Sequence, residues 1–133
     1  NIFVYNCLAK DYKNNLIEDK TNTINLSKKF KLNIEVINSN GFYELISLNI
    51  PTILILNKKI DKLTKSALSD FIELKQNNVY FEDPIKAAKF INNNIYKIDS
   101  WWLSKRVQST LKKFRSKYAR TVNDQAKVLL KAL

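Results

Sequence analysis

The chain up to residue 98 alternates short apolar runs with segments in which apolar residues recur at helical spacing. In Thr52–Leu56 every residue after Thr52 is apolar, which predicts a strand buried on both faces. A weaker strand candidate is Thr21–Asn25. Other runs rich in β-branched or aromatic residues, as is typical of strands, are Ile2–Tyr5, Leu32–Ile37 and Val79–Phe81.

Helices are expected between these runs. Asp83–Pro84 combines a good capping residue with a proline, which indicates the start of a helix over 85–96. Alternating strands and helices predict a parallel sheet with right-handed crossovers. The helical spacing also predicts helices over residues 26–30, 42–48 and 62–76. In the helix over 85–96 we expect buried Ala87, Ala88, Ile91 and Ile95.

After Asp99 the pattern indicates helices alone. Trp101–Leu103 predicts a single turn, and Ser104 is expected to cap a helix over 105–118. A last helix is expected over 123–133. The long helix has an apolar stripe of Val107, Leu111, Phe114 and Tyr118. Its basic residues lie mostly away from that stripe: Arg106, Lys112, Lys113, Arg115 and Lys117. We therefore expect an α/β domain over 1–98 and, packing on it, a basic helical extension over 99–133.

The polar turn Asn38–Gly41 lies between a predicted strand and a predicted helix, and it holds the only glycine of the chain. In an open parallel sheet, ligands bind beyond the carboxyl ends of the strands, where a following helix presents free N–H groups. Two interpretations remain open. The turn is either a ligand site or an ordinary connection, in which Gly and Asn supply positive φ angles and Glu44 complements the helix dipole.

Composition narrows the possible chemistry. The 133 residues suffice for one domain with an ordinary core. The chain has no histidine and a single cysteine, Cys7, which excludes imidazole catalysis and a disulfide framework, and argues against a zinc site. No apolar run is long enough to span a membrane. One glycine cannot form a P-loop or a dinucleotide fingerprint.

Positive charge is concentrated at the C-terminal end. From Lys105 onward there are nine basic residues and one acid, Asp124, so this segment carries +8 of the net +11. The basic face of the 105–118 helix is either a solvated surface or a contact for an anionic partner. Trp101 and Trp102 likewise either anchor a helix in the core or stack on a base or sugar.

Several motifs together resemble the C-terminal part of a family of bacterial surface-carbohydrate transferases, which are similar to two-domain, GT-B-type glycosyltransferases. The resemblance covers about Ile34 to Thr121. It rests on Asn38–Glu44, Leu48–Ile53, Asp83–Asn92, Trp101–Trp102, and Val107–Gln108 through Phe114 to Tyr118–Thr121. Near the start, Lys10–Tyr12 matches in part, but the arginine and glycine–tryptophan expected around it are absent.

The resemblance implies a three-layer, Rossmann-like fold with a parallel sheet and a helical C-terminal extension, the donor-side half of a GT-B enzyme. It implies phosphate-side contacts from Ser39, Asn40 and Gly41, with Asn38 completing the donor-binding turn, and a ribose contact from Glu44. Backbone N–H groups suit phosphate, and a carboxylate suits hydroxyl groups.

The expected function is binding of a nucleotide-sugar donor for cell-surface polysaccharide synthesis, in the cytoplasm or on the inner face of the membrane. No metal and no cofactor besides the nucleotide-sugar substrate is expected. The partner would be a missing N-terminal acceptor domain, without which the chain is expected to be inactive. The alternative is a non-enzymatic basic module that docks on an anionic membrane or, less favoured, on nucleic acid through residues 105–131.

Overall fold

The computed structural model describes residues 23–57 and 59–119, which form an α/β fold around a small parallel sheet. The sheet order is β1 (Asn33–Glu35), β2 (Thr52–Ile55) and β3 (Tyr80–Phe81), and both strand pairs are parallel. Ile34 pairs with Ile53, and Leu54 pairs with Tyr80. The carboxyl ends of the three strands therefore lie at one edge of the sheet.

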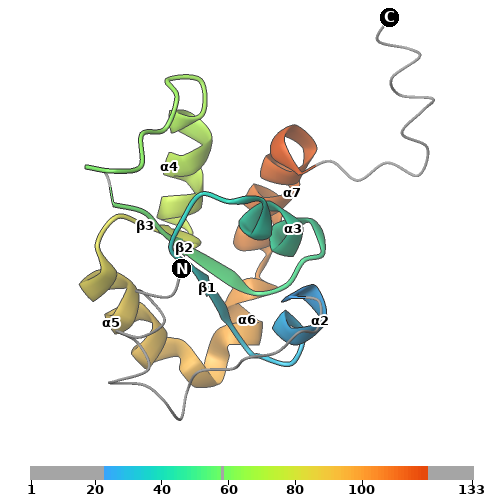
Figure 1. Ribbon diagram of the computed structural model, residues 1–133. Coiled ribbons are helices and arrows are strands. Elements are labelled where there is room, and N and C mark those ends of the chain that lie inside the picture. Colours follow the sequence, from blue (N-terminus) through green and yellow to red (C-terminus); the bar gives the residue numbers. More distant parts are fainter. Residues whose placement is uncertain (1–22, 58, 120–133) are drawn as a thin grey trace, which may run out of the picture.

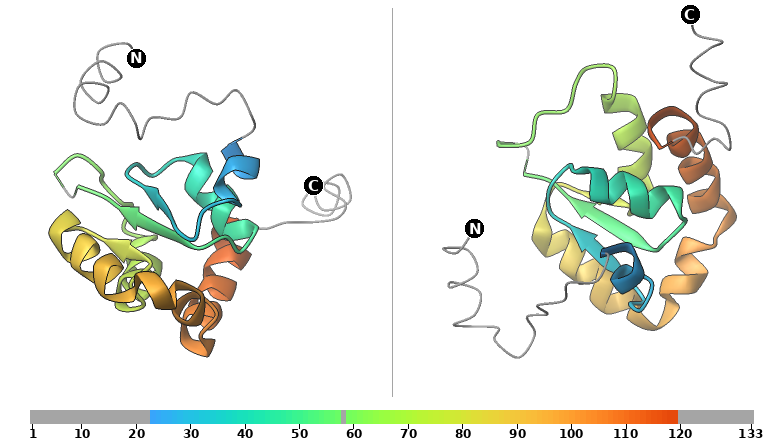
Figure 2. Two further views of the ribbon diagram at one scale, coloured as in Figure 1. Left: turned by 90° about the horizontal axis from the view of Figure 1, so that it is seen from below. Right: turned by 45° about the vertical axis from the view of Figure 1, so that its right-hand side comes forward.

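The helices and the connections between them account for the rest of the described chain. In Figure 1, α3, α4 and α7 lie above the strands and α5 lies below them, and Figure 2 shows the same arrangement from two other sides. The bounds are α2 (Thr23–Ser27), α3 (Asn40–Ser47), α4 (Leu68–Gln76), α5 (Pro84–Asn94), the 3₁₀ helix η2 (Ile95–Lys97), α6 (Ile98–Trp102) and α7 (Lys105–Tyr118).

Alternation along the strands divides the core into two clusters. Leu54 of β2 packs with α3, α4 and α7 in the larger cluster, which contains Phe42, Phe71 and Phe114. Ile53, the preceding residue, packs on the other face with Ala87 of α5. Successive side chains of a strand point to opposite faces, so a sheet covered by helices on both faces needs the continuous apolar run seen in β2.

Both tryptophans anchor helices with their ring N–H groups as well as with their apolar surface. Trp102 is almost fully buried and donates to the carbonyl of Asn49 at 3.0 Å. Trp101 donates to the carbonyl of Asn77 at 3.0 Å and contacts both core clusters. These bonds attach α6 to the ends of α3 and α4, and so support the core interpretation of the Trp–Trp pair.

Three expectations from the sequence are wrong. Residues 23–25 are helical and not extended, because the N–H of Lys28 bonds to the carbonyl of Ile24 and closes a helical turn before the chain enters β1. Of the four residues expected to be buried in the helix over 85–96, only Ala87 is: Ala88 is exposed, and Ile91 and Ile95 are half-buried. The helix predicted over 62–76 begins only at Leu68.

The predicted strand over 2–5, the motif at Lys10–Tyr12, Cys7 and the predicted helix over 123–133 lie outside the described residues. The division of the chain at residue 98 remains a prediction. Over the described range, no helix combines the length and the apolar character needed to cross a membrane. The same range holds no group of three or more Asp, Glu, Cys or His side chains suited to a metal ion.

Candidate functional site

The predicted ligand turn connects the carboxyl end of β1 to the start of α3. Ser39 is the N-cap residue and has an extended backbone with φ −114° and ψ 167°, but its side chain makes no capping bond. The N–H of Phe42 bonds to the carbonyl of Ser39 at 3.2 Å. The N–H groups of Asn40 and Gly41 have no acceptor in the part of the chain that the structure describes. The helix therefore presents two free donors at the edge of the sheet where ligands bind in open parallel sheets.

An aromatic layer holds this turn in place. The hydroxyl of Tyr43 donates to Oδ1 of Asn38 at 2.8 Å, and the Tyr43 ring stacks parallel to Phe114 with 6.1 Å between ring centroids. Asn38 thus supports the turn through its Oδ1 atom, and its role in donor binding stays a prediction. Asn40 and Glu44 are exposed on the same end of the helix.

Gly41 does not have the conformation expected from the sequence. Positive φ angles among the described residues occur at Asn49 and Asn78, and not at Gly41. A Cβ atom at Gly41 would lie 3.4 Å from Oγ of Ser39 and 3.7 Å from Oε2 of Glu35. These are ordinary van der Waals distances, so neither a positive φ angle nor a steric clash requires glycine at this position.

Glu35 is a site residue that the sequence reasoning missed. It is the last residue of β1, and both its carboxylate oxygens lie within 4 Å of the position that a Gly41 Cβ would take. Partial burial raises the pKa of this carboxyl. The sequence predicts a strand over 32–37 with Glu35 inside it, so no local pattern indicated a role for this residue, and only the structure ends β1 at Glu35. Its negative charge opposes a phosphate at the start of α3, whereas its protonated form does not.

The basic residues predicted on α7 are largely used in packing against α4. Lys113 pairs with Glu73 at 3.3 Å, and Arg106 donates to the carbonyl of Gln76 at 3.1 Å. Lys112 and Arg115 have no ion pair within residues 23–57 and 59–119. No hydrogen bond or ion pair of that range joins these five cations to the turn at Asn38–Gly41.

A second pair ties the end of α7 to the start of α4. Nζ of Lys117 lies 2.5 Å from Oδ2 of Asp70, which also accepts from the hydroxyl of Tyr118 at 2.6 Å. Both hydrogen bonds lower the pKa of Asp70. Two of the five predicted anion contacts, Lys113 and Lys117, are thus already paired with carboxylates of α4.

A hollow of about 600 Å³ lies beside β3, and the sequence did not indicate it. Burial, aided by the nearby carboxylate of Glu82, raises the pKa of Tyr80 to about 12. The Tyr80 hydroxyl donates to Glu82 at 3.4 Å, and Lys75 bonds to the same carboxylate at 2.5 Å. The apolar part of the wall comes from Leu63, Leu68, Phe71 and Ile72.

Comparison with protein families places this α/β chain in a class of transferases. The model described as "LIC12162 family transferase" matches residues 3–133. The chain belongs to this family. No curated protein and no solved structure matches the chain.

Proposed function

We propose that this chain is the donor-binding part of a GT-B-type glycosyltransferase, and that the start of α3 binds the phosphates of a nucleotide-sugar. The observation that carries the proposal is the open helix start, where the N–H groups of Asn40 and Gly41 lack acceptors and Ser39 makes no cap. Such a start, after the connection that follows a strand of a parallel sheet, combines hydrogen-bond donors with the positive end of the helix dipole. Membership of a transferase family supports a role in group transfer.

Glu44 is proposed to contact the ribose. It lies four residues after Asn40, so the two side chains share one face of α3. Its exposed carboxylate accepts hydrogen bonds from the two ribose hydroxyls without approaching the phosphates.

The chemical step is not assigned to any residue of this chain. In the proposed enzyme, the acceptor hydroxyl gives its proton to a base and its oxygen attacks the anomeric carbon of the sugar. The bond from that carbon to the phosphate oxygen breaks, and the nucleotide leaves with both electrons. We propose that the acceptor side of the cleft comes from an N-terminal domain and that the product belongs to the cell surface. The chain alone then binds nucleotide without turnover, in the cytoplasm or on the inner face of the membrane.

Calorimetric titration of the chain with UDP, GDP, CDP and CMP tests the proposal. We expect at least one nucleotide to bind, and Gly41→Val to weaken it by about tenfold or more because a β-branched side chain blocks the N–H groups. Glu44→Ala should weaken nucleoside diphosphates but not inorganic pyrophosphate, which has no ribose. Asp99→Ala is the matched control, because Asp99 is an exposed acid in the first turn of α6.

The same titration at two salt concentrations distinguishes donor binding from the alternative function, docking on a polyanion. A basic module that docks on polyanions releases counterions, so its binding falls steeply with salt. If no nucleotide binds while anionic vesicles or nucleic acid bind with a steep salt dependence, the donor proposal is wrong. Unchanged affinity in both Gly41→Val and Glu44→Ala would show that nucleotide binds elsewhere.

A further inference from the structure

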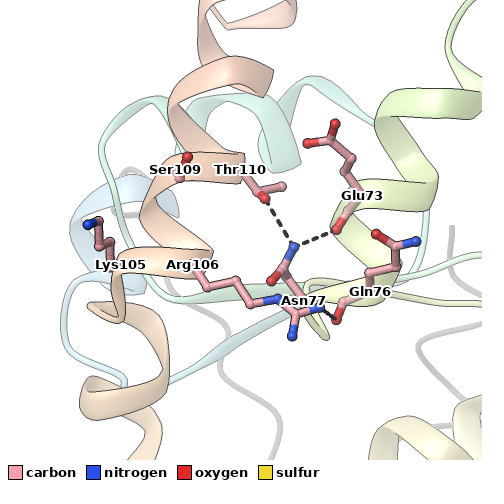
Figure 3. A pocket seen from close by; sticks show the side chains of 7 residues that line it. All are labelled: Glu73, Gln76, Asn77, Lys105, Arg106, Ser109 and Thr110. Carbon is pink, nitrogen blue, oxygen red and sulfur yellow. Dashed lines mark hydrogen bonds between the residues drawn. The ribbon is translucent and has the colours of Figure 1, made fainter.

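A second hollow, of about 520 Å³, lies between the end of α4 and the start of α7 (Figure 3). This hollow lies near the amino ends of the strands, whereas the Asn38–Gly41 turn lies at their carboxyl ends. Helix α4 runs back from the carboxyl end of β2, and Asn77 at its end comes three residues before the start of β3 at Tyr80. The hollow is therefore separate from the proposed donor site, and the inference drawn from it does not depend on that site.

Asn77 contributes an unsatisfied buried oxygen to this hollow. The residue is only 7% exposed, and its Nδ2 group donates to the carbonyl of Glu73 at 2.9 Å and to Oγ1 of Thr110 at 3.0 Å. The carbonyl of Glu73 can only accept, which settles the orientation of the amide. Oδ1 is buried and has no donor among the described residues. In Figure 3 this oxygen faces the side of the hollow where Arg106 lies. Buried acceptors are nearly always hydrogen-bonded, so this one calls for a donor.

The opposite wall is positively charged. Lys105 and Arg106 occupy the first turn of α7, a helix of 14 residues, and neither has an ion pair in the described part of the chain. Their backbone N–H groups have no acceptor there either, while Ser104 accepts from Val107. The single carboxylate of the wall, Glu73, is paired with Lys113. Two residues with cationic side chains and the positive end of the helix dipole therefore belong to one wall of the hollow.

We propose that this hollow binds a phosphate monoester that carries a neighbouring hydroxyl group. The phosphate accepts from the side chains of Lys105 and Arg106 and from the first N–H groups of α7. The Arg106 guanidinium exchanges its neutral acceptor, the carbonyl of Gln76, for a charged one, and charge-assisted hydrogen bonds are about twice as strong. This movement uncovers Oδ1 of Asn77, which then accepts from the ligand hydroxyl.

The test is an amide-resolved NMR titration of the full chain with glycerol phosphate. We expect saturable shifts at Lys105, Arg106 and the side-chain amide of Asn77. Arg106→Gln should lower the affinity by about tenfold, the value of one hydrogen bond to a charged group. Lys112→Gln is the matched control, because Lys112 is a cation of the same helix outside the hollow. Methyl phosphate, which lacks a free hydroxyl, should bind more weakly and leave the Asn77 amide unshifted.

The source of the phosphate is resolved with vesicles that contain lysophosphatidic acid, which keeps one free hydroxyl group on its glycerol phosphate, compared with vesicles of phosphatidylcholine alone. Binding to lysophosphatidic acid that depends on Arg106 identifies a lipid headgroup, and binding of glycerol phosphate alone identifies a soluble ester. Absence of both, or equal losses in Arg106→Gln and Lys112→Gln, would overturn the proposal. Gly41→Val should leave this binding unchanged, so the failure of one proposed site can be told from the failure of the other.

Discussion

Helices α3 and α5 both follow strands of the same parallel sheet, yet their first turns are built differently. At α5, the carboxylate of Asp83 accepts from the N–H of Ile85 at 2.8 Å and from that of Lys86 at 3.4 Å, and Pro84 takes the first helical position. At α3, Ser39 makes no capping bond and the first two N–H groups are free within the described residues.

The N–H groups at the start of α5 are used by the fold itself, whereas those at the start of α3 remain available to a ligand. A capping side chain contributes about 1 kcal/mol to stability. The start of α5 uses that contribution, whereas the start of α3 leaves its donors for another partner. Each helix start also has a carboxylate nearby, but only Asp83 bonds to its helix. Glu35 lies beside α3 without bonding to it, and its pKa is raised by burial. Local features that do not serve the fold are expected at functional sites.

The largest effect is expected from Phe42→Ala, because this ring anchors the open start of α3 to the core. Phe42 is fully buried, and its centroid lies 6.1 Å from that of Phe114. Removal of the ring should lower the free energy of unfolding by about 3–5 kcal/mol, measured by urea denaturation. Ile85→Ala in the first turn of α5 is the control, since Ile85 is 67% exposed and should cost little. Equal losses in the two variants would contradict this packing.

A medium effect is expected from loss of the α5 cap. Asp83→Ala should lower the free energy of unfolding by about 1 kcal/mol, because two N–H groups lose their acceptor. Ser39→Ala should change it by less than about 0.5 kcal/mol, since no capping bond is lost. Thermal and urea denaturation of both variants measure the difference. If Ser39→Ala lowers the free energy of unfolding as much as Asp83→Ala does, the Ser39 side chain caps α3 and the start of that helix is not open.

The smallest effect concerns Glu35. At neutral pH, Glu35→Gln should strengthen nucleotide binding about threefold, because it removes a negative charge that opposes the phosphates across a partly solvated distance. The pKa of Glu35 is raised in the folded state, so folding favours the protonated carboxyl. Its unfavourable contribution therefore appears as the pH rises through that pKa.

Two pH titrations test this direction of the pH dependence. The Glu35→Gln variant should be more stable than the parent chain at neutral pH, and the two should converge as the pH falls below the usual range of a glutamate carboxyl. The gap in nucleotide affinity should close over the same interval, as measured by calorimetry across that range. An affinity that is insensitive to both pH and the substitution would place the phosphates away from the start of α3.

Much of the fold could be predicted from local pattern. The continuous apolar run of β2, the Asp83–Pro84 start of α5 and the Ser104 cap of α7 each carry their cause within a few residues, and all three are confirmed. Residues 23–25 were mistaken for a strand because their composition suits either state, and the helical bond to Lys28 decided between them. Ala88 was mistaken for a core residue because helical spacing does not show where a stripe is centred.

The amino-acid pattern was sufficient to predict an α/β fold, the order of most of its elements and the position of one polar turn at the carboxyl end of a strand. These follow from hydrophobic periodicity and capping chemistry, which act over a few residues. Tertiary packing, by contrast, places Glu35 beside Gly41, pairs two carboxylates of α4 with Lys113 and Lys117, and buries Asn77 against Thr110 of α7. These contacts join separate elements, and their energies depend on distance and burial, which no local pattern contains.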